Sequence, residues 1–367
     1  MSLQEFLATP KPAPDLKIPK PSEIGKVSVI DSTARLSLRC GCFLKPTFKG
    51  RNRMNGPAYA TLIQHSSGRK VLFDLGVRKE WDSLAPVIVG LIKKSGIQII
   101  VEHNVADIIE EHGVKPAEIE AVIWSHYHFD HTGDVTTFPS STALIVGPSF
   151  KEKMTSGYPT DPNSHVVASD WAGRELREIS FHSDLRIGQF RAFDFFGDGS
   201  FYLLDTPGHA IGHMSALCRT TVECDGSFLF LGGDCCHHGA EFRPTEYLPL
   251  PAKISPSPFT AYKPHSKCPG ELFQRLHPEK SATEPFVKIA HAEDVNLATD
   301  SVRGVEEFDA AEILFVLLAH DHSLLGLLGF FPKEFNGWRE TGVKRRGTWG
   351  FLADFKEVVE DVNDMKT

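Results

Sequence analysis

The chain has 367 residues, and its 41% hydrophobic and 23% charged residues are typical of a globular protein with a sizeable core. Its net charge of −8 argues against broad electrostatic binding of nucleic acid, which requires a basic surface. The first dozen residues do not resemble a secretory signal, and no run of ~20 apolar residues predicts a membrane span. We therefore expect a cytoplasmic protein without a nucleic-acid or membrane partner, whereas its oligomeric state is left unknown.

The cysteines agree with a reducing compartment. Seven cysteines, an odd number without a dense repeating spacing, are typical of reduced thiols rather than of a disulfide framework. Two close pairs, Cys40 with Cys42 and Cys235 with Cys236, lack the gap of a zinc hairpin. We expect these four to be buried free thiols.

The first part of the chain predicts an irregular strap followed by a folded domain. Residues 1–25 are rich in proline and lysine and form the predicted strap. Residues 26–367 are expected to fold as one domain. The first clear strands are residues 59–65 and 70–74, which flank a turn made of two serines and a glycine.

A helix and a strand then lead to the most unusual stretch of the sequence. Asn104 is a plausible N-cap for a helix over residues 105–112, and Gly113 fits the position just after its end. A short apolar strand follows at residues 119–124. It leads directly into WSHYHFDHTGD, in which three histidines and an aspartate occupy six consecutive positions. In α/β sheets, ligands bind beyond this end of a strand.

The second half of the chain predicts further strands and one long connection. Residues 239–285 contain nine prolines and little periodicity, so they predict a long connection that is either a lid over a site or a disordered linker. Asp300 is expected to cap a helix that ends near Phe308. Three apolar runs predict strands, at residues 201–204, 228–231 and 313–318.

Metal-binding side chains follow these strands repeatedly, at the point where each apolar run ends. The ends of strands in one sheet lie close together, so ligands that are distant in the sequence are expected to converge. In chain order, the motifs are Asp74, His126-x-His128-x-Asp130-His131, Thr206-Pro-Gly-His209, Gly233-Asp234 and Ala319-His320-Asp321.

Their chemistry predicts a site for two metal ions. Imidazole and carboxylate groups suit zinc and related divalent cations. His126 and His128 alternate, so in an extended loop both can reach one ion from the same side. Asp130 and His131 continue the turn and face a second position. Two ions ~3.5–4 Å apart need a bridging ligand, and the carboxylate of Asp234 is a candidate for that role.

As a set, these motifs resemble the metallo-β-lactamase superfamily, and within it the two-metal lactonase-like and thioesterase-like members. The resemblance covers roughly residues 55–322. It implies an α/β protein with an αββα sandwich and the metals at one edge of the two sheets. Outside this core lie the N-terminal segment, the lid-like insertion at residues 239–285 and a C-terminal extension at residues 323–367.

The resemblance also implies a role for each side chain. Asp74 would orient the ligands from behind, although a turn cap is the alternative. His213 would support rather than bind, and the Ala-His-Asp context favours His320 over His322 as a ligand. The two divalent cations are expected to be zinc first, with iron, manganese or cobalt also compatible. His126, His128 and His209 would bind one cation, Asp130, His131 and His320 would bind the other, and Asp234 would bridge the two.

Such a site predicts a hydrolase that acts on a small-molecule substrate. Zinc lowers the pKa of a bound water to ~7, so a bridging hydroxide would attack the carbonyl carbon of a cyclic ester or amide, opening a lactone or a lactam. Asp130 is placed to accept the proton of the hydroxide. General acid–base help of this kind contributes ~10²- to 10⁴-fold to the rate.

The residue that stabilises the developing oxyanion is less clear. In bacterial acyl-homoserine lactonases, which this sequence resembles, a tyrosine follows the bridging aspartate at the third position, where this chain has His237. His237 could donate a hydrogen bond to the oxyanion, and so could Tyr127 or Tyr247. The alternatives are an exposed loop residue for His237 and a packing role for Tyr127.

The residues that line the substrate pocket also have alternative assignments. Phe330, Phe331 and Trp338 in the tail could line a pocket or simply extend the core. The size and arrangement resemble fungal members of the superfamily, some of which open lactone or lactam rings. The remaining histidines, including His65, His103, His165, His182 and His291, are expected to be surface or core residues.

Other functions compete with ring opening. A thioesterase or glyoxalase-II-like hydrolase would use nearly the same metal site on an open-chain thioester. A non-catalytic binding module is disfavoured because every expected ligand type is present. A nuclease is disfavoured by the acidic composition, and an oxygen-reducing di-iron protein by the histidine at position 128, where such proteins usually carry a glutamate.

Overall fold

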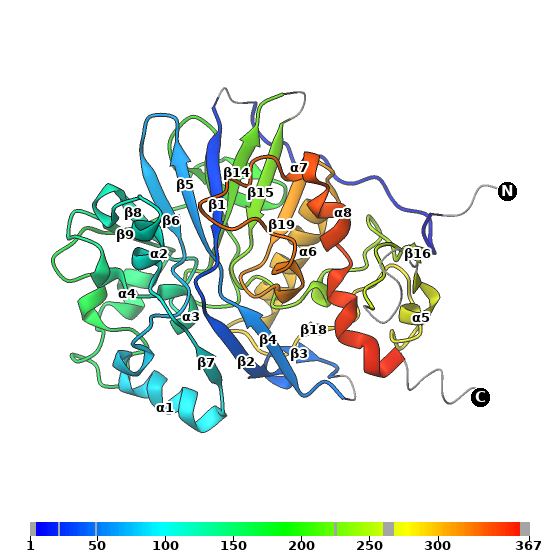
Figure 1. Cartoon of the computed structure of the whole chain (residues 1–367), viewed down its shortest axis with the longest axis horizontal. Helices are drawn as coiled ribbons and strands as arrows, with labels where there is room; N and C mark the ends of the chain where they lie inside the picture. Colours follow the sequence, from blue (N-terminus) through cyan, green and yellow to red (C-terminus); the bar gives the residue numbers. More distant parts are fainter. Residues whose placement is uncertain (1–4, 21–22, 48–49, 224–225, 260–267, 360–367) are drawn as a thin grey trace.

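Two six-stranded sheets pack face to face in the computed structural model, which describes residues 5–20, 23–47, 50–223, 226–259 and 268–359 (Figure 1). In spatial order, the first sheet consists of β1 (Gly25–Ile30), β5 (Ala60–His65), β6 (Lys70–Phe73), β8 (Ala121–Ile123), β9 (Ala143–Val146) and β10 (Leu176–Glu178). The second consists of β11 (Arg186–Ile187), β12 (Phe190–Asp194), β13 (Phe201–Asp205), β14 (Met214–Thr221), β15 (Ser227–Leu231) and β19 (Leu314–Leu317).

The central strands are apolar on both faces because each face is covered. In β13, Leu203 belongs to the core between the two sheets, whereas Leu204 belongs to the core beneath a helix on the outer face. Leu229 and Phe230 divide in the same way on β15. This follows from the two-residue period of a strand, which points neighbouring side chains to opposite faces. The runs of buried residues in these strands therefore indicate a sheet that is covered twice.

Helices cover the outer faces and complete the αββα sandwich that the sequence predicted. On the first sheet lie α2 (Val105–Glu111) and α4 (Phe150–Met154), whose apolar residues share a core with the outer side of β5, β6, β8 and β9. On the second sheet lies α6 (Val295–Ala310), and Figure 1 shows it on the side away from α2 and α4. None of the helices in the described ranges is long and apolar enough to cross a membrane.

Strand direction brings the strand ends of interest to one edge of the sandwich. In the first sheet, β6 and β8 are parallel. In the second, β13 and β15 both pair antiparallel with β14, so they share one direction, and β19 is parallel to β15. The loops that follow β13, β15 and β19 consequently leave the second sheet at the same edge.

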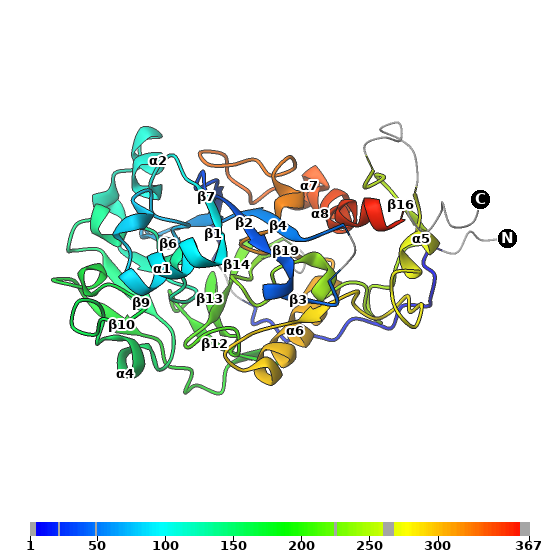
Figure 2. The same ribbon diagram turned by 90° about the horizontal axis from the view of Figure 1, so that it is seen from below.

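Two additions surround this core. A small sheet of β2 (Arg35–Arg39), β4 (Arg53–Pro57) and β7 (Gln98–Ile100) lies beside the sandwich. The described part of the insertion at residues 239–285 forms β16 (Lys253–Ile254), β17 (Cys268–Pro269) and α5 (Glu271–Gln274), and it lies next to the C-terminal helices α7 (Trp338–Thr341) and α8 (Val343–Gly347) (Figure 2). Insertion and extension share an apolar core that includes Leu250, Phe273, Phe286, Phe351 and Phe355.

The N-terminal strap is irregular, as the sequence predicted. Residues 5–20 contain no helix or strand apart from a β-bridge between Phe6 and Pro251. Backbone hydrogen bonds fasten the strap, because the Leu7 N–H donates to the Leu250 carbonyl and the Gly188 N–H donates to the Leu16 carbonyl. The strap therefore joins the insertion to the edge of the second sheet. The prediction that residues 26–367 form one domain stays a prediction.

Most predicted elements are confirmed within a few residues, including α2, whose N-cap Asn104 forms a capping box with Asp107. One helix start was wrong. The predicted cap Asp300 lies inside α6, which begins six positions earlier, after Asp294. The Asp294 carboxylate accepts the backbone N–H groups of Asn296 (2.9 Å) and Leu297 (3.0 Å), which a free helix start leaves unpaired.

One further expectation needs correction, and one open alternative is decided by the structure. Among the cysteines expected to be buried, Cys42 is exposed, whereas Cys40, Cys235 and Cys236 are buried free thiols. In the tail, Trp338 is 2% exposed and packs on Phe315 with ring centroids 5.8 Å apart, so it belongs to the core between the sheets.

The cap of α6 generates a prediction about stability. Asp294→Ala is expected to lower the free energy of unfolding by ~1 kcal/mol, because two N–H groups at the helix start lose their acceptor. Asp300→Ala is the matched control, since its exposed ion pair with Arg303 is worth less than ~0.5 kcal/mol. Urea denaturation measures both variants. Equal losses in the two would contradict the assignment of the cap.

Candidate metal centre

The side chains singled out in the sequence meet at one edge of the sandwich. Each comes from the segment that follows a strand, and the short helix α3 (Phe129–Thr132) begins directly after the first two histidines. His126 and His128 follow β8, Asp130 and His131 lie on α3, His209 lies between β13 and β14, Asp234 follows β15, and His320 follows β19.

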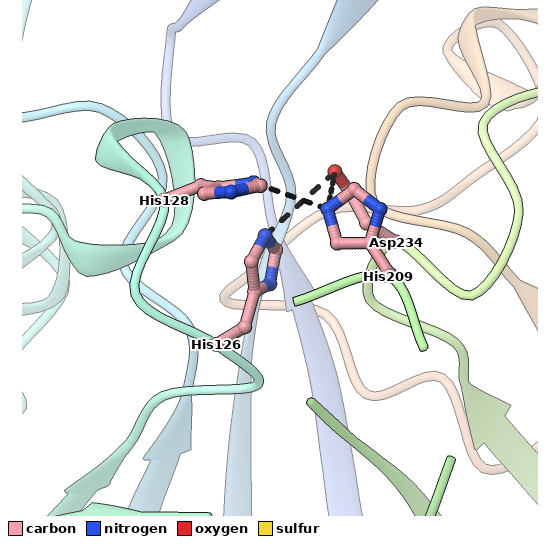
Figure 3. Close-up of side chains that lie close together, drawn as sticks. All are labelled: His126, His128, His209 and Asp234. Carbon is pink, nitrogen blue, oxygen red and sulfur yellow. Dashed lines mark hydrogen bonds and ion pairs between the residues drawn. The ribbon is translucent and has the colours of Figure 1, made fainter. Parts of the chain in front are cut away.

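One group of four side chains faces a common point. The potential ligand atoms of His126, His128, His209 and Asp234 all lie within 4.8 Å of one another, and the side chains converge in Figure 3. His209 Nε2 lies 3.0 Å from His128 Nδ1 and 3.6 Å from Asp234 Oδ2. His126 Nε2 lies 3.9 Å from the same carboxylate oxygen. Three imidazoles and one carboxylate oxygen therefore surround a single position.

A second group faces the other oxygen of the same carboxylate. Asp130, His131 and His320 also offer ligand atoms within 4.8 Å of one another. Asp234 Oδ1 lies 3.2 Å from His131 Nε2 and 3.1 Å from His320 Nε2. His320 Nε2 lies 3.6 Å from Asp130 Oδ2. Asp234 thus presents Oδ2 to the first group and Oδ1 to the second.

Several nitrogen and oxygen atoms of these side chains are buried without a hydrogen-bond partner, which shows whether the two groups fit metal ions. Among the described residues, His126 Nε2, His131 Nε2 and Asp234 Oδ1 are buried without a partner in hydrogen-bond geometry. Each buried polar atom left without a partner costs about 1–3 kcal/mol, so a cluster of them calls for an explanation. Imidazole nitrogens and carboxylate oxygens are ligands for divalent cations, and a cation in each group would satisfy these atoms.

Hydrogen bonds from behind turn the ring nitrogens toward these positions. His131 Nδ1 lies 2.8 Å from Asp74 Oδ2 and His320 Nδ1 lies 2.7 Å from the Pro57 carbonyl. Both partners only accept hydrogen bonds, so Nδ1 carries a proton and Nε2 is the nitrogen directed at Asp234. Asp74 itself is fixed by Ser125, whose N–H donates to Oδ1 (2.6 Å) and whose hydroxyl donates to Oδ2 (2.8 Å). Orientation of this kind is common behind metal ligands.

His213 supports the carboxylate rather than joining either group. Its Nδ1 lies 2.8 Å from the Thr206 carbonyl, and its Nε2 accepts the backbone N–H of Asp234 at 3.0 Å. The carbonyl can only accept a hydrogen bond, so the proton of the His213 ring is on Nδ1. Nε2 then keeps its lone pair and accepts the N–H of Asp234. The contact holds the turn after β15, where Gly233 adopts φ +53°.

Burial sets the charge of the first group. Burial lowers the pKa of His126 and His209 well below the ordinary histidine value and lowers the pKa of His128 to about 4. These rings are therefore neutral near pH 7 and carry free lone pairs. In the second group, burial is the largest single effect and lowers the pKa of His131 and His320, but the neighbouring carboxylates together outweigh it and raise both. These are Asp234 and Asp74 for His131, and Asp234 and Asp130 for His320. Burial would raise the pKa of Asp234, yet His131 and His320 lower it.

A cavity of about 200 Å³ opens onto both groups. Its wall is mostly apolar. It comes from Leu38 and Phe43, from α1 (Pro86–Ser95) and the residue Ile97 after it, and from the residues around the histidine motif. None of the described residues of the insertion or of the C-terminal extension lines it. Of the two alternatives for Phe330, Phe331 and Trp338, extension of the core therefore holds rather than lining of this cavity. The lining residues beside the metal-facing groups are Leu38, Phe43, Ile88, Leu91, Ile97, Tyr127, Phe129, His165 and His237.

Comparison with known proteins agrees with this geometry. Residues 53–219 match the metallo-beta-lactamase superfamily. Gamma-lactamase FDB1 from Fusarium pseudograminearum (strain CS3096) is 43% identical over 362 residues, which cover 95% of this chain and 87% of that protein. Metallo-hydrolase mfmC from Annulohypoxylon moriforme is also 43% identical over 362 residues, covering 97% of this chain and 94% of its own length.

The chain belongs to the metallo-β-lactamase superfamily. Among solved structures, an N-acyl homoserine lactone hydrolase with the product N-hexanoyl-L-homoserine bound at its catalytic metal centre shares the fold, with a TM-score of 0.56 and 18% identity. The match covers 85% of this chain and 100% of that one. The predicted superfamily and its αββα sandwich are thus confirmed.

In this metallo-β-lactamase-type site, the three candidates for oxyanion stabilisation separate clearly. His237 is 3% exposed, lines the cavity and places Nε2 3.4 Å from Asp234 Oδ2, so the alternative of an exposed loop residue was wrong. Tyr127 also lines the cavity and is buried. Tyr247 is not among the lining residues. His165, which was expected to be an ordinary surface or core residue, does line the cavity.

The C-terminal extension reaches the centre from behind through Asp354, which lies in the 3₁₀ segment Gly350–Phe355. Its carboxylate lies 2.9 Å from His238 Nε2, 3.2 Å from His322 Nε2 and 2.5 Å from Arg51 NH2. His322 therefore faces Asp354, whereas its neighbour His320 faces the metal-binding groups. Asp354 links the loops after β15 and β19 to each other and to the N-terminal segment.

The sequence reading missed the apolar wall and the Asp354 link. The wall had a local signal, because residues 87–92 read VIVGLI within a single helix and leave Leu91 48% exposed. The Asp354 link had no local signal, since a lone carboxylate near the end of the chain does not reveal its distant partners.

The Asp354 link predicts a large effect on stability. Asp354→Asn is expected to lower the free energy of unfolding by ~3 kcal/mol, because it removes the charge that pairs with Arg51 and with two histidines in a largely buried position. Asp300→Asn, in an exposed ion pair, should change it by less than ~0.5 kcal/mol. Chemical denaturation of both variants decides the matter. A small effect of Asp354→Asn would show that the link carries little energy.

Proposed function

We propose that the protein is a metal-dependent hydrolase that opens a lactam or lactone ring in a small molecule. The observation that carries this proposal is the placement of one Asp234 oxygen before each of two ligand groups. Two comparisons support it. The match to the relative named gamma-lactamase covers 87% of that relative's length, and the fold is shared with a lactone hydrolase.

The proposed ligands are those named from the sequence. His126, His128 and His209 would hold one divalent cation, and Asp130, His131 and His320 the other, with Asp234 between them. The nitrogen and oxygen donors favour zinc for both. When bound, the two cations supply Lewis acidity, which makes a water molecule nucleophilic near neutral pH.

The side chains around the cavity have separate tasks in this proposal. Asp130 lines the cavity beside His320 and accepts the proton of the attacking water, which it then passes to the ring nitrogen or oxygen that leaves. His237 donates a hydrogen bond from its ring to the carbonyl oxygen as negative charge develops there. Water adds across the ring bond, so one open-chain product carries both the new carboxylate and the released amine or hydroxyl.

The cavity supports a compact substrate. Its volume of about 200 Å³ is below the roughly 300–1,000 Å³ of most small-molecule sites. The apolar wall, which includes Phe43, Tyr127 and Phe129, would hold the body of the substrate and exclude water from the reacting carbonyl. A reducing compartment such as the cytoplasm suits a chain whose described cysteines are free thiols.

The ligand assignment predicts a joint loss of metal and activity. Asp234→Ala and His209→Ala are each expected to lower the bound metal and to abolish hydrolysis, because both residues face a cation position with buried donors. His182→Ala, at an exposed histidine away from the cavity, is the control and should leave both unchanged. Elemental analysis and a hydrolysis assay on the same samples measure the effect. Full activity with full metal content in Asp234→Ala would refute the bridging role.

The proposed reaction predicts a substrate preference. Purified protein with two equivalents of metal should open small lactams or lactones and should turn over acyl thioesters at least ~10²-fold more slowly in kcat/KM, because the compact cavity favours a ring over a long open chain. A panel of the three substrate classes, followed by product mass, tests this. Preferred hydrolysis of thioesters would overturn the ring-opening proposal while leaving the metal centre intact.

A further inference from the structure

A buried carboxyl group that the proposed mechanism does not use lies directly behind His237. It belongs to Glu241, the last residue of the 3₁₀ turn η6 (Gly239–Glu241), and its side chain is 0% exposed. We propose that Glu241 is a positioning residue that fixes the His237 ring at the wall of the substrate cavity. This inference rests on the proposed function, in which His237 donates a hydrogen bond to the substrate.

Backbone hydrogen bonds provide the first support. Glu241 Oε2 accepts the backbone N–H of His237 at 2.5 Å and that of His238 at 3.0 Å. In return, His238 Nδ1 accepts the backbone N–H of Ala240 at 3.1 Å, which completes a capping box around η6. One carboxylate oxygen therefore fixes the backbone at the residue whose side chain enters the cavity.

Packing leaves the ring few alternative positions. The His237 ring packs against the ring of Phe43, at a centroid distance of 4.6 Å, and against that of His209, at 4.9 Å. On the other side of the turn, a Cβ at Gly239 would lie 2.5 Å from Phe351 Cδ1, so the backbone is closely packed there as well. With two rings packed against His237, the reach of its side chain into the cavity is set by the backbone that Glu241 holds.

Unpaired atoms provide independent support. Among the described residues, Glu241 Oε1 and both ring nitrogens of His237 are buried without a hydrogen-bond partner. His237 Nδ1 lies 4.0 Å from Glu241 Oε2, about 1 Å beyond hydrogen-bond distance. Buried polar groups of this kind are expected to find partners. A substrate oxygen in the cavity would satisfy Nε2, so the ring presents an unpaired polar atom to a ligand that approaches from the cavity.

A double-mutant cycle tests the inference, with lactam or lactone opening as the assay. His237→Ala is expected to lower kcat by ~10²-fold, as the loss of an oxyanion donor does. Glu241→Ala should lower kcat by ~10-fold with little change in KM, since a misplaced group mainly impairs the transition state. In the His237→Ala background, Glu241→Ala should cost less than ~3-fold more. Bound metal should equal that of the unmodified protein in every variant.

Glu241→Gln is the conservative partner in this experiment. Its amide oxygen can still accept the N–H groups of His237 and His238, so kcat should stay within ~3-fold of the unmodified protein. If Glu241→Ala does not fold, Glu241→Asp replaces it, because the shorter side chain withdraws the acceptor while leaving a smaller cavity.

The outcomes separate this inference from the proposed function. An undiminished effect of Glu241→Ala in the His237→Ala background would overturn it, because Glu241 would then act independently of His237. Loss of metal in Glu241→Gln would overturn it too, since the side chain would then serve the metal centre. If His237→Ala keeps full kcat, both the role of His237 and this inference fail, whereas ring opening by the unmodified protein would still support the hydrolase.

Discussion

One carboxylate whose two oxygens face two different groups of side chains is the constraint on which the rest of the centre depends. Asp234 is buried, and its oxygens face two different groups of imidazoles. A buried negative charge is tolerated only where positive charge or hydrogen-bond donors surround it, so the neighbouring rings and any cations are needed for the folded state as well as for chemistry. The parallel strands supply this surrounding, because they deliver loops from both sheets to one edge.

A second layer of contacts converts these loops into a rigid frame. Asp74 holds His131, His213 holds the backbone of Asp234, and the Pro57 carbonyl holds His320. Each contact fixes which ring nitrogen carries the proton and leaves the other nitrogen directed at the centre. The frame extends outward as far as Asp354 near the end of the chain, so the peripheral segments are part of the architecture of the centre.

The sequence predicted the core of the fold and the cluster, but not its surroundings. The motifs were readable because each ligand follows an apolar strand directly, and strand ends converge by topology alone. The start of α6 was misplaced because Asp294 and Asp300 are both suitable cap residues, and only the backbone shows which one accepts the free N–H groups. The environment of His237 could not be read, because its neighbours Phe43 and Glu241 come from an unrelated segment and from a short turn.

Much of the apolar wall of the cavity comes from segments that carry no potential metal ligand, whereas Tyr127 and Phe129 lie within the histidine motif itself. Leu38, Phe43, Ile88 and Leu91 precede the first histidine motif, and none of them contributes a potential metal ligand. This part of the wall is therefore separate along the chain from the metal-facing groups. Related proteins that descend from one ancestor could acquire new substrates through changes in helix α1 and the segment before it, while they keep the same potential metal ligands. A laboratory library restricted to those positions would vary substrate selectivity without changing any of these ligands.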